Sequence, residues 1–536
     1  MSSDHPGPPA PPPSGGGAPP PGSEPGPEPG PPSGSEPGAE LLDGGASGGR
    51  PLAAWVVPTV VAVVLVALVG GAFAVGSALR SGGSQPENVL PGDAVAFAKL
   101  DLDPSAGQKL AALRFMRQFP TLEDQVKGDD LRRSLYEALS EGEGDLEGVD
   151  YETDVEPWLG QRVGIAALPP AKGGGDEPVG VVALQVTDED AAREGIRTIA
   201  EASGESPPGV ATLDGYALVA ENQKTADDAA SQAEGSSLAE SGQFTDDMEA
   251  IGEPGVSTGW FDLDGLARLA GGSGEQSASA MLGGAAPVSG RLAYAVRFDG
   301  DDLEAVAKAR GVKGVKDVGG DGDTGLARLP ESTVAAMGVA NGGELVRQGW
   351  DQAYADAQGT PAGQQLQLLI AQAESFGFAL PDDLATLFGS SFTLALDEGG
   401  LNGAVPRVGA RVTTDTTEAL ALLDKLEQLA GPMLGQVLVR RPTEDGIVVT
   451  SDPSYAAQLG SDGALGQTDG FQAALPEVDG ADFAVWVDLD RLASALGSEA
   501  GDAETRESME AVDGIGATGA IEDTGDVTYR LRVVTR

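Results

Sequence analysis

The sequence repeats itself along most of its length, and this internal repeat limits the folds that the chain can adopt. Landmarks of a first copy return in the same order in a second copy. For example, the strand-to-helix step at residues 260–269 returns at residues 486–496. Repetition of a whole pattern of elements indicates two copies of one structural unit. We therefore predict one repeat at residues 89–310 and a second at residues 325–536.

Each copy combines features of strands, helices and hairpins. Residues 179–186 read as a strand, and apolar residues at helical spacing follow it: Ile196, Ile199 and Ala200. Asp214-Gly215 between two short apolar runs predicts a hairpin, and Asp445-Gly446 predicts its counterpart. This mixture predicts an α+β fold, with two tandem repeats of a largely antiparallel sheet that carries helices on one face. The sequence leaves open whether the two sheets lie side by side or join.

A run without any charged side chain extends from Ala53 to Leu79. About 20 apolar residues can cross the hydrocarbon core of a bilayer as a helix, and a helix satisfies its own backbone polar groups there. Because 50 residues precede a run longer than a signal-peptide core, we predict an uncleaved transmembrane helix at residues 53–79. Residues 1–50 are rich in Pro and Gly, which predicts a disordered tail, and residues 80–88 would form a linker.

Charges beside the apolar run do not decide its orientation. Arg50 precedes the run, while Arg80 and Lys99 follow it, so the positive-inside rule favours neither side. Long domains translocate largely regardless of their charge. We therefore predict a single-pass plasma-membrane protein with a cytoplasmic tail and an extracytoplasmic C-terminal domain.

The composition excludes several classes of function. The chain has 83 Asp and Glu against 33 Lys and Arg, a formal charge of -50. Nucleic-acid binding needs clustered basic residues, so no nucleic-acid partner is expected. The chain has no cysteine, and its one histidine is His5 in the tail. The long domain therefore has no thiol nucleophile, no Ser-His-Asp triad and no histidine zinc site.

Glycine-rich motifs match known signatures without their structural context. Residues 255–259 match G-x-S-x-G but lead into a strand, whereas a nucleophile elbow leads from a strand into a helix. Residues 320–325 and 514–519 match G-x-G-x-x-G, but neither opens a helix after a strand. We interpret both as loop glycines. We therefore name no catalytic residue and no cofactor.

Two pairs of carboxylates occupy equivalent places in the two copies. These D-x-D pairs are Asp262 with Asp264 and Asp488 with Asp490. Such a pair at the end of a strand could hold Ca²⁺ or Mg²⁺. Leucines at helical spacing follow each pair at once, so we interpret the second Asp of each pair as a helix cap. A metal site stays the alternative.

The order of these features is similar to that of a known group of proteins. It comprises the Pro/Gly-rich tail, the single apolar run, an L-P-x-x-x-V opening at Leu90 and the D-L-D step after Phe261 and Val487. The layout resembles a domain-of-unknown-function family of single-pass membrane proteins of high-GC Gram-positive bacteria. The resemblance covers most of residues 52–536 and implies a cell-envelope protein. No catalytic motif accompanies that family, so it assigns no site residue.

Three functions remain open from the sequence. The first is a non-enzymatic, membrane-anchored binding or scaffolding protein of the cell envelope, with a protein or lipid partner. The second is a carrier of a lipid or apolar envelope precursor, which requires an apolar cavity between the sheet and the helices. The third is a carboxylate-dependent hydrolase, which requires two acids that converge in a cleft.

Overall fold

The computed structural model describes the chain from Ser84 onward, with gaps. The described residues are 84–102, 104–119, 132–133, 136, 148–170, 178–204, 206–269, 289–312, 322–401, 407–430, 438–496 and 503–536. The predicted tail (1–50), the predicted transmembrane helix (53–79) and residues 80–83 of the predicted linker lie outside them. The chain divides into two units after Gly49, and the described residues all belong to the second. In this described part, no helix is both long enough and apolar enough to cross a membrane.

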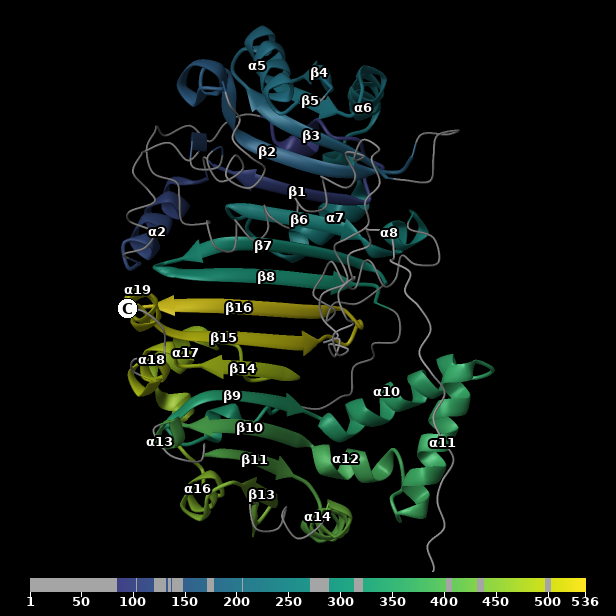
Figure 1. The fold of residues 1–536 in the computed structure, drawn as a ribbon, viewed down its shortest axis with the longest axis vertical. Helices are drawn as coiled ribbons and strands as arrows, with labels where there is room; N and C mark the ends of the chain where they lie inside the picture. Colours follow the sequence, from purple (N-terminus) through teal and green to yellow (C-terminus); the bar gives the residue numbers. More distant parts are fainter. Residues whose placement is uncertain are drawn as a thin grey trace, which may run out of the picture. The chain divides into compact units, whose positions relative to one another are not determined.

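A single 16-stranded sheet is the centre of this unit (Figure 1). Each hydrogen-bonded pair of neighbouring strands is antiparallel. The strands are β1 (Ala96–Asp101), β2 (Leu159–Leu168), β3 (Val179–Val186), β4 (Gly209–Leu213), β5 (Tyr216–Ala220), β6 (Ser257–Asp262), β7 (Arg291–Asp299), β8 (Asp302–Arg310), β9 (Thr333–Ala340), β10 (Ser391–Asp397), β11 (Val408–Thr413), β12 (Val439–Pro442), β13 (Gly446–Thr450), β14 (Phe483–Val487), β15 (Val512–Ile521) and β16 (Val527–Thr535).

The order of the strands is the same on both sides of the central β8–β16 pair. Outward from β8 the order is β8-β7-β6-β1-β2-β3-β5-β4, and outward from β16 it is β16-β15-β14-β9-β10-β11-β13-β12. The two halves of the chain are thus joined edge to edge in one sheet, which answers the question of placement that the sequence left open.

Helices lie between the strands in both halves. They are α2 (Ala106–Met116), α5 (Glu189–Ala202), α6 (Gln223–Gly235), α7 (Gly242–Ala250), α8 (Leu263–Leu269), α10 (Gly342–Ala357), α11 (Pro361–Ser375), α12 (Asp382–Phe388), α13 (Glu398–Leu401), α14 (Thr416–Ala430), α16 (Pro453–Leu459), α17 (Asp469–Ala474), α18 (Leu489–Leu496) and α19 (Ala503–Glu510). The mixed helix and antiparallel-sheet class that the sequence predicts is confirmed.

The helices cover both faces of the sheet, so the prediction of helices on one face is wrong. Successive residues of a strand point to opposite faces. On β5, Ala217 packs with α5, whereas Leu218 packs with α6. On β13, Ile447 packs with α14 and Val448 with α16. The physical reason is visible in β5, a continuous apolar run of the kind that is buried on both faces. We call the face that carries Trp260 and Trp486 the tryptophan face.

The predicted turns and glycine motifs have different outcomes. Asp214 and Gly215 join β4 to β5 with φ values of 46° and 80°, as a type I′ turn requires. The β12–β13 hairpin also forms, but its turn ends before Gly446, where β13 begins. Residues 255–259 lead into β6, as expected, whereas Gly514–Gly519 lie inside β15 and not in a loop. A Cβ atom on Gly514 would lie 2.3 Å from the ring of Trp486, so close packing explains this glycine.

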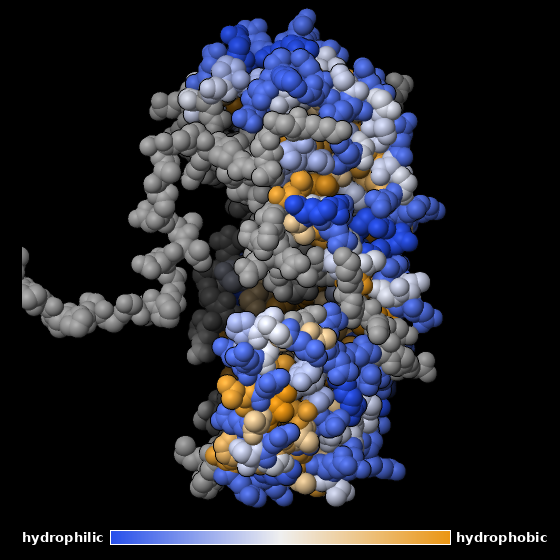
Figure 2. Space-filling view, turned by 90° about the vertical axis from the view of Figure 1, so that its right-hand side faces the viewer, coloured by the Kyte–Doolittle hydropathy of each residue, from blue (hydrophilic) through white to orange (hydrophobic). Residues whose placement is uncertain are grey.

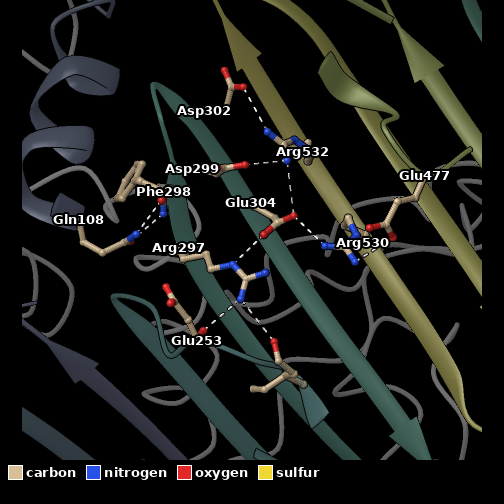
Figure 3. Close-up of polar contacts among 11 residues, drawn as sticks. Gln108, Glu253, Arg297, Phe298, Asp299, Asp302, Glu304, Glu477, Arg530 and Arg532 are labelled. Carbon is tan, nitrogen blue, oxygen red and sulfur yellow. Dashed lines mark hydrogen bonds and ion pairs between the residues drawn. The ribbon is translucent and has the colours of Figure 1, made fainter. Parts of the chain in front are cut away.

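A buried carboxylate holds the two halves together on the tryptophan face (Figure 3). Glu304 of β8 accepts hydrogen bonds from Arg297 Nε at 2.7 Å and from Arg530 Nη1 of β16 at 2.9 Å, and it lies 3.6 Å from Arg532 Nη1. Burial raises the pKa of this carboxyl, but the hydrogen bonds and charges of the arginines outweigh burial, and the net pKa lies below its ordinary value. Charge pairing therefore fixes the register of the central junction.

Candidate functional site

The first Asp of each D-x-D pair caps a helix. Asp262 Oδ1 accepts the backbone N–H of Gly265 at 2.9 Å, and Asp488 Oδ1 accepts that of Arg491 at 2.9 Å. The sequence assigned this role to the second Asp, and that prediction is wrong. The helices α8 and α18 begin directly after the first Asp, earlier than the spacing of the leucines indicated.

The second Asp of each pair serves other contacts. Asp264 Oδ2 accepts the N–H of Gly290 at 3.3 Å, and Asp490 forms an ion pair with Arg536. Within the described ranges, no group of three or more His, Cys, Asp or Glu side chains is arranged to hold a metal ion.

Asp488 and Asp490 also line an acidic cavity of about 490 Å³ beside β14 and α18. Burial raises the pKa of the Asp488 carboxyl, and the charges of Asp490 and Asp513 act in the same direction. Arginines already bind all three: Arg491 Nε lies 3.4 Å from Asp488, and Arg536 pairs with the other two. A hydrolase needs an acid that can give or take a proton from substrate, so these pairings do not favour that reading. Nor is this the apolar cavity that a carrier requires, because acidic and polar residues line it.

A second feature of the site is an apolar patch on the face of the sheet opposite the tryptophan face. Three rows of paired residues cross the six strands β10, β9, β14, β15, β16 and β8. No position in these rows carries a charge. The rows are Leu394, Met337, Val485, Ala517, Leu531 and Ala305; Phe392, Val339, Phe483, Gly519, Tyr529 and Ala307; and Leu396, Ala335, Val487, Ile515, Val533 and Leu303.

The middle of this apolar patch is exposed. Met337, Leu394 and Phe483 are each 37% exposed and Tyr529 is 39% exposed. None of the four belongs to a hydrophobic cluster of the described residues. In Figure 1, α10 and α12 lie at one end of β9 and β10, and α13 and α18 lie at the other. At the usual spacing of strands, the patch measures roughly 24 Å across the strands and about 13 Å along them.

The same strands present opposite chemistry on their two faces. On β16, Arg530 and Arg532 lie on the tryptophan face and are paired with acids, whereas Tyr529 and Leu531 lie in the apolar patch. Burial raises the pKa of the Tyr529 phenol. The charges of the junction are therefore all turned away from the patch, which offers a ligand only apolar contacts and one hydroxyl.

Beside the patch, α10 and α11 form a helical hairpin between β9 and β10 that exposes further apolar side chains. Leu368 is 70% exposed, Leu369 59% and Phe376 50%. Figure 2 views the side on which these helices lie, and hydrophobic residues gather at the surface in its lower half. Large contiguous apolar patches at a protein surface mark interaction sites, ligand-binding grooves or aggregation-prone surface.

The comparison with known proteins identifies a partial family match. Residues 58–208 match the sequence model of a family described as "Protein of unknown function (DUF3352)". This confirms the likeness to a family of unknown function over these residues. The match ends before β4 and includes none of the strands of the apolar patch. No curated protein and no solved structure matches the chain.

Proposed function

We propose that this chain is a non-enzymatic binding protein of the cell envelope, and that its apolar patch binds the acyl part of a lipid or of an apolar envelope precursor. One observation carries the proposal: three rows of paired residues across six strands carry no charge, in a chain of which 22% is charged. An apolar ligand gains from the open part of this surface around Met337, Leu394, Phe483 and Tyr529. At the β8 end, by contrast, the patch packs against α2 through Leu303, Ala305 and Val533. Protein interfaces of similar size normally include polar groups, and the patch supplies only the hydroxyl of Tyr529.

The proposal includes the predicted anchor at residues 53–79 and an extracytoplasmic domain, as in the resembling single-pass proteins of high-GC Gram-positive bacteria. The geometry near the linker bears on how a tethered domain would present the patch. The Tyr216 hydroxyl donates to the carbonyl of Ser84 at 2.8 Å, and Leu90 packs in the core of the tryptophan face. The chain therefore enters the domain on the face opposite the apolar patch, and a tether to a membrane would leave the patch open to the envelope.

Binding of a dansyl-labelled fatty acid to the full-length protein in nanodiscs tests the proposed ligand class. Because the fatty acid also enters the lipid of the nanodisc, the signal is the dansyl fluorescence in excess of that from empty nanodiscs. We expect such an excess with the wild type and its loss with Met337→Glu/Leu394→Glu. The matched control is Leu110→Glu, because Leu110 is also apolar and is 54% exposed, but lies on α2, outside the patch. Equal fluorescence for all three proteins, or none for the wild type, would remove the proposal.

Reporter fusions at the two termini test the predicted orientation separately. A periplasm- or surface-active reporter should work at the C-terminus and fail at the N-terminus. Activity from the N-terminal fusion would reverse the proposed topology, whatever the outcome of the fatty-acid experiment.

A further inference from the structure

The α10–α11 turn and most of α11 differ in charge from α10, which carries Glu344, Arg347, Asp351 and Asp356. Residues 357–373 contain no charged side chain, although the chain as a whole has a formal charge of -50. The segment includes the most exposed leucines of the hairpin, Leu368 and Leu369. Glutamines provide much of its polar surface. Such a surface can be buried in an interface without burying an unpaired charge. Burial of unpaired charges carries a large free-energy cost.

The exposure of α11 is particular to the second half. In the first half, α2 occupies the same place in the chain, between the first two strands of the unit. Its residues Ala111, Ala112, Phe115 and Met116 are buried against the sheet. In α10 and α11, by contrast, no described side chain beyond Gly343 is buried. The hairpin is therefore not folded against its own domain in the way that α2 is.

A hollow lies next to these leucines on the same element. A cavity of about 440 Å³ at the turn between α10 and α11 is lined only by uncharged residues: Tyr354, Gln358, Gly359, Thr360, Gly363, Gln364 and Gln367. The projecting Leu368 and Leu369 follow directly in the sequence. A projection and a hollow side by side on one helix make that helix self-complementary, because a twofold axis places each projection opposite the other copy's hollow.

We infer that two copies of this chain associate through α11, with Leu368 and Leu369 of each copy seated at the α10–α11 turn of the other. Charge favours a second copy as the occupant. Two chains of charge -50 repel each other over most surfaces, and the uncharged segment 357–373 allows them to meet without placing acids in contact.

The contact area indicates how strong this association is. The 15 residues of α11 form a helix roughly 22 Å long, which covers less than the roughly 800 Å² per partner of a stable soluble dimer. The inference therefore rests on the anchor of the proposed function, because two tethered copies share one membrane and meet at a raised effective concentration. The dimer should form in membranes and dissociate in dilute detergent.

Cysteine cross-linking tests the contact directly, because the chain has no native cysteine. Each Leu368 faces the other copy's hollow and not the other Leu368, so a flexible bis-maleimide is used in place of a disulfide, which needs Cα atoms within about 7 Å. Full-length Leu368→Cys is treated with this reagent in native membranes and compared with Leu110→Cys, the exposed leucine of α2. We expect covalent dimers with Leu368→Cys only. Adding Leu369→Glu to the Leu368→Cys chain should abolish the cross-link, while the monomer keeps its thermal unfolding profile, which separates loss of contact from loss of folding.

The outcomes separate this inference from the proposed function. If membrane fractionation recovers the chain from the bilayer and Leu368→Cys does not cross-link more than Leu110→Cys, the dimer is overturned and the anchor stands. If the chain is recovered in the soluble fraction, the anchor fails and the dimer that depends on it fails too. Quenching of a fluorophore on Leu368→Cys by spin-labelled lipid would assign α11 to the bilayer and would likewise overturn the dimer.

Discussion

The two halves of the sheet share one strand order, but side chains at equivalent positions differ in their exposure. Ala98 on β1 pairs with Gly259, the residue before Trp260. Met337 on β9 pairs with Val485, the residue before Trp486. Ala98 is 2% exposed, whereas Met337 is 37% exposed. The paired residues of the neighbouring strands, Ile165 and Leu394, are 5% and 37% exposed. These positions are thus buried in one half of the sheet and exposed in the other.

The tryptophan face shows a second difference between the halves. The ring of Phe244 on α7 packs edge-on against Trp260 with ring centroids 5.9 Å apart. The ring of Phe471 on α17 packs in the same way against Trp486 with centroids 5.5 Å apart. Three residues after each Phe, the first half has Asp247 and the second has Ala474. Two copies of one scaffold have therefore exchanged a buried carboxylate for a methyl group at one position.

Loss of the Asp247 carboxylate should produce the largest effect on stability. Asp247 is 1% exposed and accepts from Trp260 Nε1 at 2.9 Å, Arg291 Nε at 2.6 Å and Arg310 Nη1 at 3.0 Å. Asp247→Ala would copy the second half while leaving both arginines without this partner, at a cost of about 3–5 kcal/mol in the free energy of unfolding. Urea unfolding measures it.

Asp246→Ala is the matched control, because Asp246 precedes Asp247 on α7 and its side chain is exposed. Its effect should lie within about 0.5 kcal/mol. Similar values for the two variants would mean that the buried carboxylate contributes nothing particular to the first half.

The comparison of the apolar positions predicts the next largest effect. Ile165→Ala removes a buried side chain and should lower the free energy of unfolding by about 2–4 kcal/mol. Leu394→Ala, at the equivalent exposed position, should cost about 1 kcal/mol or less, yet it should weaken binding of the fatty acid. Chemical denaturation of both variants measures the two losses in the free energy of unfolding. Equal losses would show that the apolar patch is covered in solution.

The central junction should weaken when Glu304 becomes neutral. Glu304→Gln removes the charge that binds the arginines of β7 and β16, at a cost of about 2–3 kcal/mol at neutral pH. Because the folded state lowers the pKa of Glu304 below its ordinary value of 4.5, this stabilisation is complete above pH 4.5 and is lost as the pH falls through the lower, folded-state pKa.

The measurement is therefore the difference in stability between wild type and Glu304→Gln as a function of pH. The difference should be constant from neutral pH down to about pH 5 and should shrink in acid. A difference that grows in acid would contradict the assigned direction of the pKa shift.

Local patterns in the sequence predict part of this architecture, and the rest depends on tertiary packing. The type I′ turn at Asp214-Gly215 and the helix cap within the D-x-D step follow from backbone chemistry within a few residues. The apolar patch does not. Phe483 to Val487 is a continuous apolar run, which indicates a strand buried on both faces, and the structure leaves one of those faces open. Tertiary packing decides this: α10 and α11 bury no described side chain beyond Gly343, whereas α2 packs on β7 and β8.

The smallest expected effect on stability is the difference between substitutions of Trp260 and Trp486. Trp260 Nε1 donates to Asp247, whereas Trp486 Nε1 is buried with no hydrogen-bond partner among the described residues. Trp260→Phe loses apolar contact and a hydrogen bond to a charged group, and Trp486→Phe loses apolar contact but relieves an unpaired donor. The first should therefore cost about 1–2 kcal/mol more than the second, measured by urea unfolding of the two variants. If Trp486→Phe is as costly, its indole N–H has a partner, and the second half has replaced the carboxylate of the first rather than lost it.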